Sequence, residues 1–157
     1  MQREIRRKDR QLDDESALLD ILMNGEYGVL STVGSEGQPY GVPISYVLDG
    51  NAIYVHCAPE GHKLDNIAHQ PQVSFCVVGM AQPIYDQSFS TYYTSVIAFG
   101  KMVEVTNESE KINALTMLCE KYLPEHMDKV ADNIAMSLSR TAVYRLDIER
   151  MTGKSKR

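Results

Sequence analysis

Cysteine is scarce in this sequence, and long apolar runs are absent. The three cysteines, Cys57, Cys76 and Cys119, lie far apart without a Cys-x-x-Cys pair, and an odd number cannot all pair within one chain. We therefore expect reduced, buried thiols. No segment approaches the roughly 18 consecutive apolar residues that span a bilayer, and the first ten residues lack the apolar core of a signal peptide. The sequence predicts a cytoplasmic protein.

Several signatures of catalysis and nucleic-acid binding are also missing. The sequence has no Gly-x-Ser-x-Gly nucleophile motif and no Gly-x-Gly-x-x-Gly dinucleotide motif. Its carboxylates are scattered, with no pair that forms an acid/base couple. The formal net charge of −5 argues against a general nucleic-acid binder. Because no strong nucleophile or base is present, any catalysis would have to come from a cofactor.

The residue pattern predicts a mainly β protein with added helices. A chain of 157 residues with 43% apolar residues can form one domain, residues 1–157. Segments rich in Val, Ile, Tyr and Phe predict six strands, at residues 27–33, 39–48, 52–58, 72–79, 90–105 and 142–148. Helical patterns are expected at residues 13–25, 62–69, 107–122 and 125–137, with a polar loop at 80–88 and a basic tail after residue 150.

Tight turns, including Asp49-Gly50, make the first three strands antiparallel neighbours in a predicted β-meander. Because the helices come late in the sequence, the pattern favours a small closed or split barrel over a doubly wound α/β sheet.

The strand at 39–48 alternates bulky and small residues. Bulky side chains occupy the even positions, whereas Gly41, Pro43 and Ser45 occupy the odd ones. Small residues let a flat ligand approach the backbone, so we expect the odd face to bind a planar ring. The alternative is that Pro43 only marks a bulge or an edge strand.

A Pro/Gly turn delivers His62 and Lys63 to the start of the helix at 62–69. Backbone N–H groups at a helix N-terminus lack internal partners and carry the positive end of the helix dipole, so these two side chains would complete a phosphate site. We call this region the anion site. The alternative is an ordinary solvated His-Lys pair.

Three histidines and a cysteine lie within fourteen residues, at His56, Cys57, His62 and His69, and raise the question of a metal site. His56 and Cys57 are neighbours on a strand and must point to opposite faces, and neither they nor His62 and His69 have metal-ligand spacing. We therefore expect no metal site. His56 could instead donate a hydrogen bond to a bound substrate, which makes it the candidate catalytic residue, or it could be structural.

Several segments match one known family when taken in order. They are Arg6–Arg10, Gly28–Thr32, Tyr40–Tyr46, His56–Lys63, Tyr93–Gly100 and Thr152–Lys154. On these segments, nearly the whole chain resembles the pyridoxamine 5′-phosphate oxidase-like, FMN-binding split-barrel proteins, in particular the nitroimidazole-resistance (Nim) type. The resemblance implies a six-stranded antiparallel split β-barrel with peripheral helices. It also implies a homodimer with FMN bound at the subunit interface.

The resemblance also assigns roles to particular residues. The isoalloxazine edge would run along Val42, Pro43, Ile44, Ser45 and Tyr46. His62 and Lys63 would hold the phosphate, and His56 and Ala58 would lie close to the ring or the ribityl chain. Ser95 and Lys154 would approach a flavin, either their own or that of the partner subunit.

The chain departs from the oxidase at informative places. His62 stands where the oxidase has an arginine, which removes a planar, two-pronged grip on phosphate. The substrate-binding tail of the oxidase has no counterpart, so pyridoxamine phosphate is a poor candidate substrate. The sequence favours an FMN-dependent oxidoreductase that passes electrons from a nicotinamide nucleotide to a small, nitro-aromatic type of substrate. The alternatives are a non-catalytic flavin- or haem-binding module and a deazaflavin enzyme.

Overall fold

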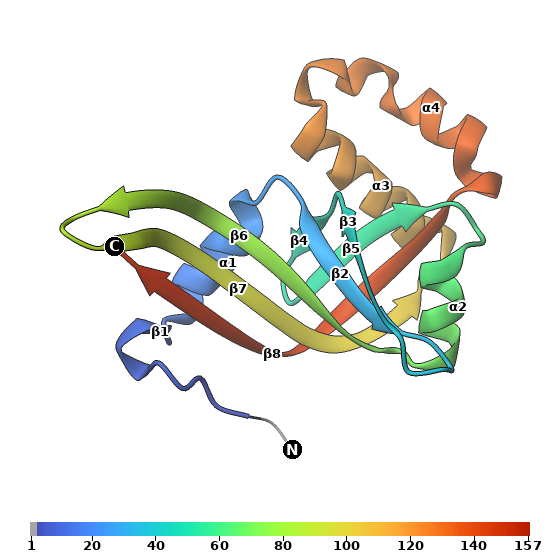
Figure 1. Cartoon of the computed structure of the whole chain (residues 1–157). Coiled ribbons are helices and arrows are strands. Elements are labelled where there is room, and N and C mark those ends of the chain that lie inside the picture. Colours follow the sequence, from blue (N-terminus) through green and yellow to red (C-terminus); the bar gives the residue numbers. More distant parts are fainter. Residues whose placement is uncertain (1–2) are drawn as a thin grey trace.

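The computed structural model describes residues 3–157, and its centre is a curved sheet of eight strands (Figure 1). The strand order is β3-β2-β6-β7-β8-β5-β4, and β1 adds to β8. All pairings are antiparallel. The strands are β1 (Gln11–Leu12), β2 (Gly28–Val33), β3 (Pro39–Ile44), β4 (Val47–Asp49), β5 (Ala52–Cys57), β6 (Gln72–Tyr85), β7 (Phe89–Glu104) and β8 (Ala142–Lys156).

The sheet closes because β3 and β4 are consecutive in the chain but lie at opposite ends of the strand order. Ile44 pairs with Gly28 on β2, whereas Val47, three residues later, pairs with Tyr54 on β5. The segment between them therefore joins the two edges of the sheet, which gives a split β-barrel. Both expected antiparallel pairings of the predicted strand 39–48 are present, with β2 and with β5, but the strand is broken into β3 and β4 instead of being continuous.

The strand count exceeds the predicted six for two reasons: the break between β3 and β4, and the short strand β1. The predicted loop at 80–88 is also wrong, because β6 and β7 run on as a long two-stranded ribbon with a turn only at residues 86–88. The predicted tail after residue 150 is instead the end of β8, which pairs with β7 from Ala98 to Tyr93. Pairing with a long neighbour, rather than local composition, makes these polar segments extended.

The helices form where their end signals predict them. Asp14 caps α1 (Glu15–Asn24) by accepting from the Ser16 amide at 3.1 Å, and Asn107 caps α3 (Glu108–Tyr122) by accepting from the Glu110 amide at 2.9 Å. The other helices are α2 (His62–His69), α4 (Val130–Ser137) and three short 3₁₀ segments, η1 (Lys8–Arg10), η2 (Pro124–Lys129) and η3 (Leu138–Arg140). No helix in residues 3–157 is long and apolar enough to cross a membrane.

The strand β5 separates two apolar cores. Ile53 and Val55 face the barrel interior, whereas Tyr54 faces a second cluster under α3 and α4. Fully buried side chains of the barrel interior include Leu22, Leu30, Tyr46, Phe75 and Leu146. The second cluster includes Ala114, Leu118, Val130, Ile134 and Val143. The three cysteines are free and only partly buried, which refines the expectation of buried thiols.

Candidate functional site

The two faces of β3 differ as its residue pattern predicts. Gly41, Pro43 and Ser45 are exposed, whereas Val42 and Ile44 pack against the barrel core. A side chain at Gly41 would place its Cβ 3.3 Å from Cγ1 of Val29, so a larger residue would crowd this surface. β3 is also an edge strand, which suits a proline without an N–H group. The exposed face leaves a flat, accessible backbone surface.

The anion site forms at the start of α2. The amides of Leu64 and Asp65 both donate to the carbonyl of Gly61, and no side chain caps the helix. The amides of His62 and Lys63 come before these first helical bonds, so they remain available to a ligand or water. Gly61 has φ of +144°, a conformation that side chains disfavour, which explains the glycine at this turn. The turn itself contains the exposed Ala58.

A ring contact joins the anion site to β3. The imidazole of His62 lies over the ring of Tyr40, with centroids 4.1 Å apart and an interplanar angle of 30°. Lys63 is half-buried and lies near Cys57 at the end of β5: burial raises the pKa of the Cys57 thiol, and the Lys63 charge partly offsets this rise. The two sites predicted from separate segments are therefore adjacent.

His56 and Ser45 share a hollow beneath α3 and α4. The hollow has a volume of about 360 Å³ and also contacts Tyr122 of α3 and Ile134 of α4. The His56 side chain is exposed at this hollow, yet partial burial still lowers its pKa, so the neutral imidazole is favoured. Cys57, the next residue, packs on the opposite side of β5 against the barrel core. Within residues 3–157, no cluster of His, Cys, Asp or Glu side chains could hold a metal ion.

Ser95 and Lys154 lie opposite each other on β7 and β8. Their chain neighbours Val96 and Gly153 are buried, so both side chains point to the outer face of the sheet. The exposed residues of β3 lie on this same outer face. Residues that pair across neighbouring strands share one face of the sheet, and successive pairs connect β3 to β8 in the order Pro43, Val29, Cys76, Ile97 and Thr152. Figure 1 shows α2 and the C-terminal end of β8 at opposite ends of the sheet. One chain therefore does not bring Lys154 to the anion site.

Tyr122 has a role that the sequence does not indicate. Its hydroxyl accepts from the Tyr46 amide at 3.0 Å and lies 2.7 Å from the carbonyl of Glu26 and 3.1 Å from that of Tyr46. It replaces the ladder bonds that are lost where β3 ends and β4 begins. The ring of Tyr46 is fully buried, and its hydroxyl donates to the carbonyl of Leu22. Tyr46 thus anchors the strand from inside the barrel and cannot lie along a ligand by its side chain.

Comparison with known proteins agrees with this architecture. A family profile described as pyridoxamine 5′-phosphate oxidase matches residues 14–155. The chain belongs to the pyridoxamine 5′-phosphate oxidase family. No curated protein matches the sequence.

Solved structures of this family's fold resemble the chain over most of its length. A candidate 5-nitroimidazole antibiotic resistance protein from Bacteroides thetaiotaomicron is 21% identical, with a TM-score of 0.78 over 92% of this chain and 85% of that one. The flavocytochrome Anf3 from Azotobacter vinelandii is 19% identical, with a TM-score of 0.87 over 98% and 72%. An FAD- and haem-binding protein from Mycobacterium smegmatis is 19% identical, with a TM-score of 0.81 over 94% and 73%. At these identities, the likeness concerns the fold.

Proposed function

We propose that the chain binds FMN, with the phosphate at the anion site and the ring along the exposed face of β3. The observation that carries this proposal is the contact between Tyr40 and His62, because it makes a phosphate site and a flat ring site contiguous. The residues present fit the cofactor chemically. Lys63 and the uncapped start of α2 suit a dianionic phosphate, and the small residues Gly41, Pro43 and Ser45 suit a planar ring.

The proposed activity is that of an FMN-dependent oxidoreductase. When bound, FMN would supply the redox chemistry, accepting electrons from a reduced nicotinamide nucleotide and passing them to a small substrate such as a nitro-aromatic compound. The side chains of this chain would bind and orient the reactants, and His56 would donate a hydrogen bond to the bound substrate. The name of the Bacteroides thetaiotaomicron protein supports the nitro-aromatic choice.

The proposed assembly is a homodimer with FMN at the subunit interface. Ser95 pairs with Lys154, and Lys154 lies near the C-terminal end of β8, which is opposite α2 in Figure 1, so these two residues would reach the flavin of a partner subunit. The outer face that carries them is partly apolar and includes Val78, which is 57% exposed. An exposed apolar surface of this kind is typical of protein association sites.

A second candidate is a flavin- or haem-binding module without turnover. The structural likeness to a flavocytochrome and to an FAD- and haem-binding protein favours it. His56 is an accessible imidazole of the kind that ligates haem iron. A deazaflavin in place of FMN is the third candidate for the same ring site.

The absorption spectrum and mass of the molecule that copurifies with the protein separate these candidates. A flavin spectrum with the mass of FMN supports the proposal, a Soret band supports haem, and a different mass with deazaflavin fluorescence supports the third candidate. Bleaching by NADH or NADPH, followed by reoxidation on addition of a nitro-aromatic compound, would establish turnover. Protein that neither retains nor binds added FMN contradicts the proposal.

A further inference from the structure

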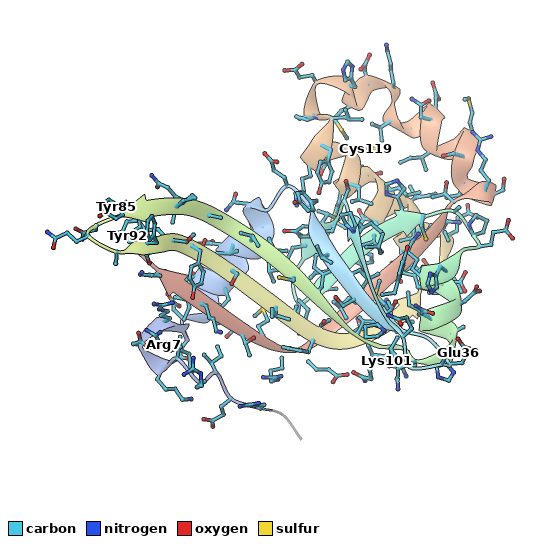
Figure 2. The ribbon with its side chains drawn as sticks, viewed as in Figure 1. Arg7, Glu36, Tyr85, Tyr92, Lys101 and Cys119 are labelled. Atoms are coloured by element: carbon cyan, nitrogen blue, oxygen red, sulfur yellow. The ribbon has the colours of Figure 1, made fainter. Side chains whose placement is uncertain are left out.

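The hollow beneath α3 and α4 extends away from the proposed ring site into the helical part of the molecule. We call it the α3–α4 hollow. It is lined on the strand side by Ser45 and His56, and on the helix side by Leu118 and Cys119 of α3 and Ile134 and Ser137 of α4. Figure 2 labels Cys119 on α3, beside α4. Its volume of about 360 Å³ lies at the small end of the roughly 300–1,000 Å³ that ligand pockets span.

Charge is absent from the lining of the hollow. Every side chain that lines it is apolar or an uncharged polar group, apart from His56. Burial lowers the pKa of His56, which favours the neutral imidazole there as well. A charged ligand would give up its hydration in the hollow without gaining an opposite charge. The lining therefore selects against phosphates, carboxylates and ammonium ions.

Most polar side chains that line the hollow already have hydrogen-bond partners. The hydroxyls of Ser137 and Thr141 donate to the carbonyls of Asn133 and Ser137, the side-chain amide of Asn133 donates to the carbonyl of Lys129, and the Tyr122 hydroxyl bonds to the backbone between β3 and β4. Within residues 3–157, no hydrogen bond satisfies the side chains of Ser45 or His56. Polar groups of a ligand would therefore pair with these two residues, while its apolar part contacts the helices.

We propose that the α3–α4 hollow binds an uncharged, single-ring compound with one polar substituent. The substituent pairs with Ser45 and His56, and the ring packs against Leu118 and Ile134, which are 4% and 7% exposed. Because Ser45 and His56 also border the proposed flavin ring, this compound would be the electron-accepting substrate. That last step rests on the proposed function, whereas the binding of an uncharged ring does not.

Three probes of nearly the same shape test whether the hollow prefers uncharged ligands to ions. They are benzamide, which is neutral, benzoate, which is an anion, and benzamidinium, which is a cation. Their dissociation constants are measured by calorimetry with the full chain, both flavin-free and after incubation with FMN. We expect benzamide to bind at least about tenfold more tightly than either ion, because an unpaired charge loses hydration. Binding that ignores charge, or no binding of benzamide, overturns the proposal.

A matched pair of variants on α4 locates the binding site. Ser137→Phe fills the hollow from its lining, whereas Ala135→Phe adds the same ring at an exposed position of the same helix. We expect Ser137→Phe to weaken benzamide binding at least about tenfold and Ala135→Phe to leave it unchanged. If both variants weaken benzamide binding equally, or if neither does, benzamide does not bind in the α3–α4 hollow and the proposal is overturned. If Ser137→Phe does not fold, Asn133→Phe replaces it, since Asn133 is exposed and also lines the hollow.

The two proposals fail in distinguishable ways. If Ser137→Phe weakens benzamide binding but the protein does not bind FMN, the ligand site in the hollow is supported and the flavin proposal is contradicted. If FMN binds normally but benzamide does not, the hollow proposal falls and the flavin proposal stands. Perturbation of the bound FMN spectrum by benzamide would support the adjacency of the two sites, and an unchanged spectrum at saturating benzamide would overturn the electron-acceptor assignment.

Discussion

His62 stacks on Tyr40, with ring centroids 4.1 Å apart and planes inclined by 30°. This contact holds the imidazole between β3 and the start of α2, at the position where the sequence resemblance implies an arginine in the oxidase. Stacking fixes the ring but leaves it without the two parallel donors of a guanidinium. In the proposed site, Lys63 would therefore make the stronger contact with the phosphate and His62 the weaker one.

Lys63→Ala should weaken FMN binding. Loss of a charge-assisted hydrogen bond to phosphate costs about 1.5–3 kcal/mol, or roughly a 10- to 150-fold rise in the dissociation constant. Fluorescence titration of flavin-free protein with FMN measures it. Lys129→Ala, which removes an exposed lysine at the end of η2, is the matched control and should bind as wild type does. An unchanged constant for Lys63→Ala removes Lys63 from the site.

His62→Arg should tighten FMN binding. An arginine can form two parallel charge-assisted bonds to phosphate, whereas an imidazole cannot. The same titration should give a lower dissociation constant for the variant than for wild type. An unchanged constant would mean that His62 does not contact the phosphate.

Tyr122→Phe should destabilise the fold although it removes a single oxygen. The Tyr46 amide and the carbonyl of Glu26 lose their partner at the β3–β4 break. An unsatisfied, partly buried backbone group costs about 1–3 kcal/mol in the free energy of unfolding. Denaturant unfolding measures the loss. Tyr27→Phe, at a tyrosine that is 58% exposed, should change the value by less than about 0.5 kcal/mol, and an equal loss in both variants would contradict the role of Tyr122.

The hydrogen bonds of Tyr122 belong to a part of the fold that local sequence patterns do not predict. The alternation of small and bulky residues predicts the two faces of β3, and the Pro/Gly turn predicts the start of α2, because both features depend on neighbouring residues. The break after Ile44 depends on a tyrosine 76 residues away from Tyr46, so no local pattern contains it. Because of that break, β4 is a separate strand, and it pairs with β5.

The end of β8 illustrates a second limit. Its polar residues from Met151 to Lys156 read as a tail, and only the long neighbouring strand β7 makes them extended. Local patterns do not predict the α3–α4 hollow for a similar reason, since its walls come from helices that dock on β5 only in the folded chain. The sequence indicates Ser45 and His56 individually, but their shared recess depends on tertiary packing.

An ionic network between α3 and the sheet predicts a pH effect on stability. Glu110 accepts from Tyr54 at 2.9 Å and pairs with Arg145 at 2.5 Å. These partners hold the pKa of Glu110 below its usual value of 4.5. A carboxyl with a depressed folded-state pKa stabilises the fold above its unfolded value, and this contribution is lost as the pH falls through the folded value.

Glu110→Gln should therefore lower the free energy of unfolding at pH 7 by about 1 kcal/mol or less, as expected for a partly exposed ion pair. The gap between variant and wild type should begin to narrow as the pH falls below about 4.5, where Glu110 protonates in the unfolded chain, and it should close below the depressed folded-state pKa, where Glu110 is protonated in both states of the wild type. Denaturant unfolding from pH 7 to pH 3 measures both. Glu120→Gln, exposed on the same helix, should show no such gap, and a gap that persists at low pH would contradict the assignment.

Mixed dimers test whether each flavin is shared between subunits. Lys63 lies at the start of α2, and Lys154 lies toward the opposite end of the sheet, so the proposed site takes one lysine from each subunit. Homodimers of Lys63→Ala and of Lys154→Ala should then both bind FMN weakly. A heterodimer of the two variants should contain one intact site and one site with both defects.

Two different affinity tags allow the heterodimer to be purified and titrated with FMN. About half of its sites should show wild-type affinity, and FMN should raise its melting temperature, because a ligand that binds only the assembled fold stabilises that fold. If both lysines of a site came from one subunit, each site in the heterodimer would carry one defect and no tight class would appear. That result, or wild-type FMN affinity in Lys154→Ala alone, contradicts the shared site.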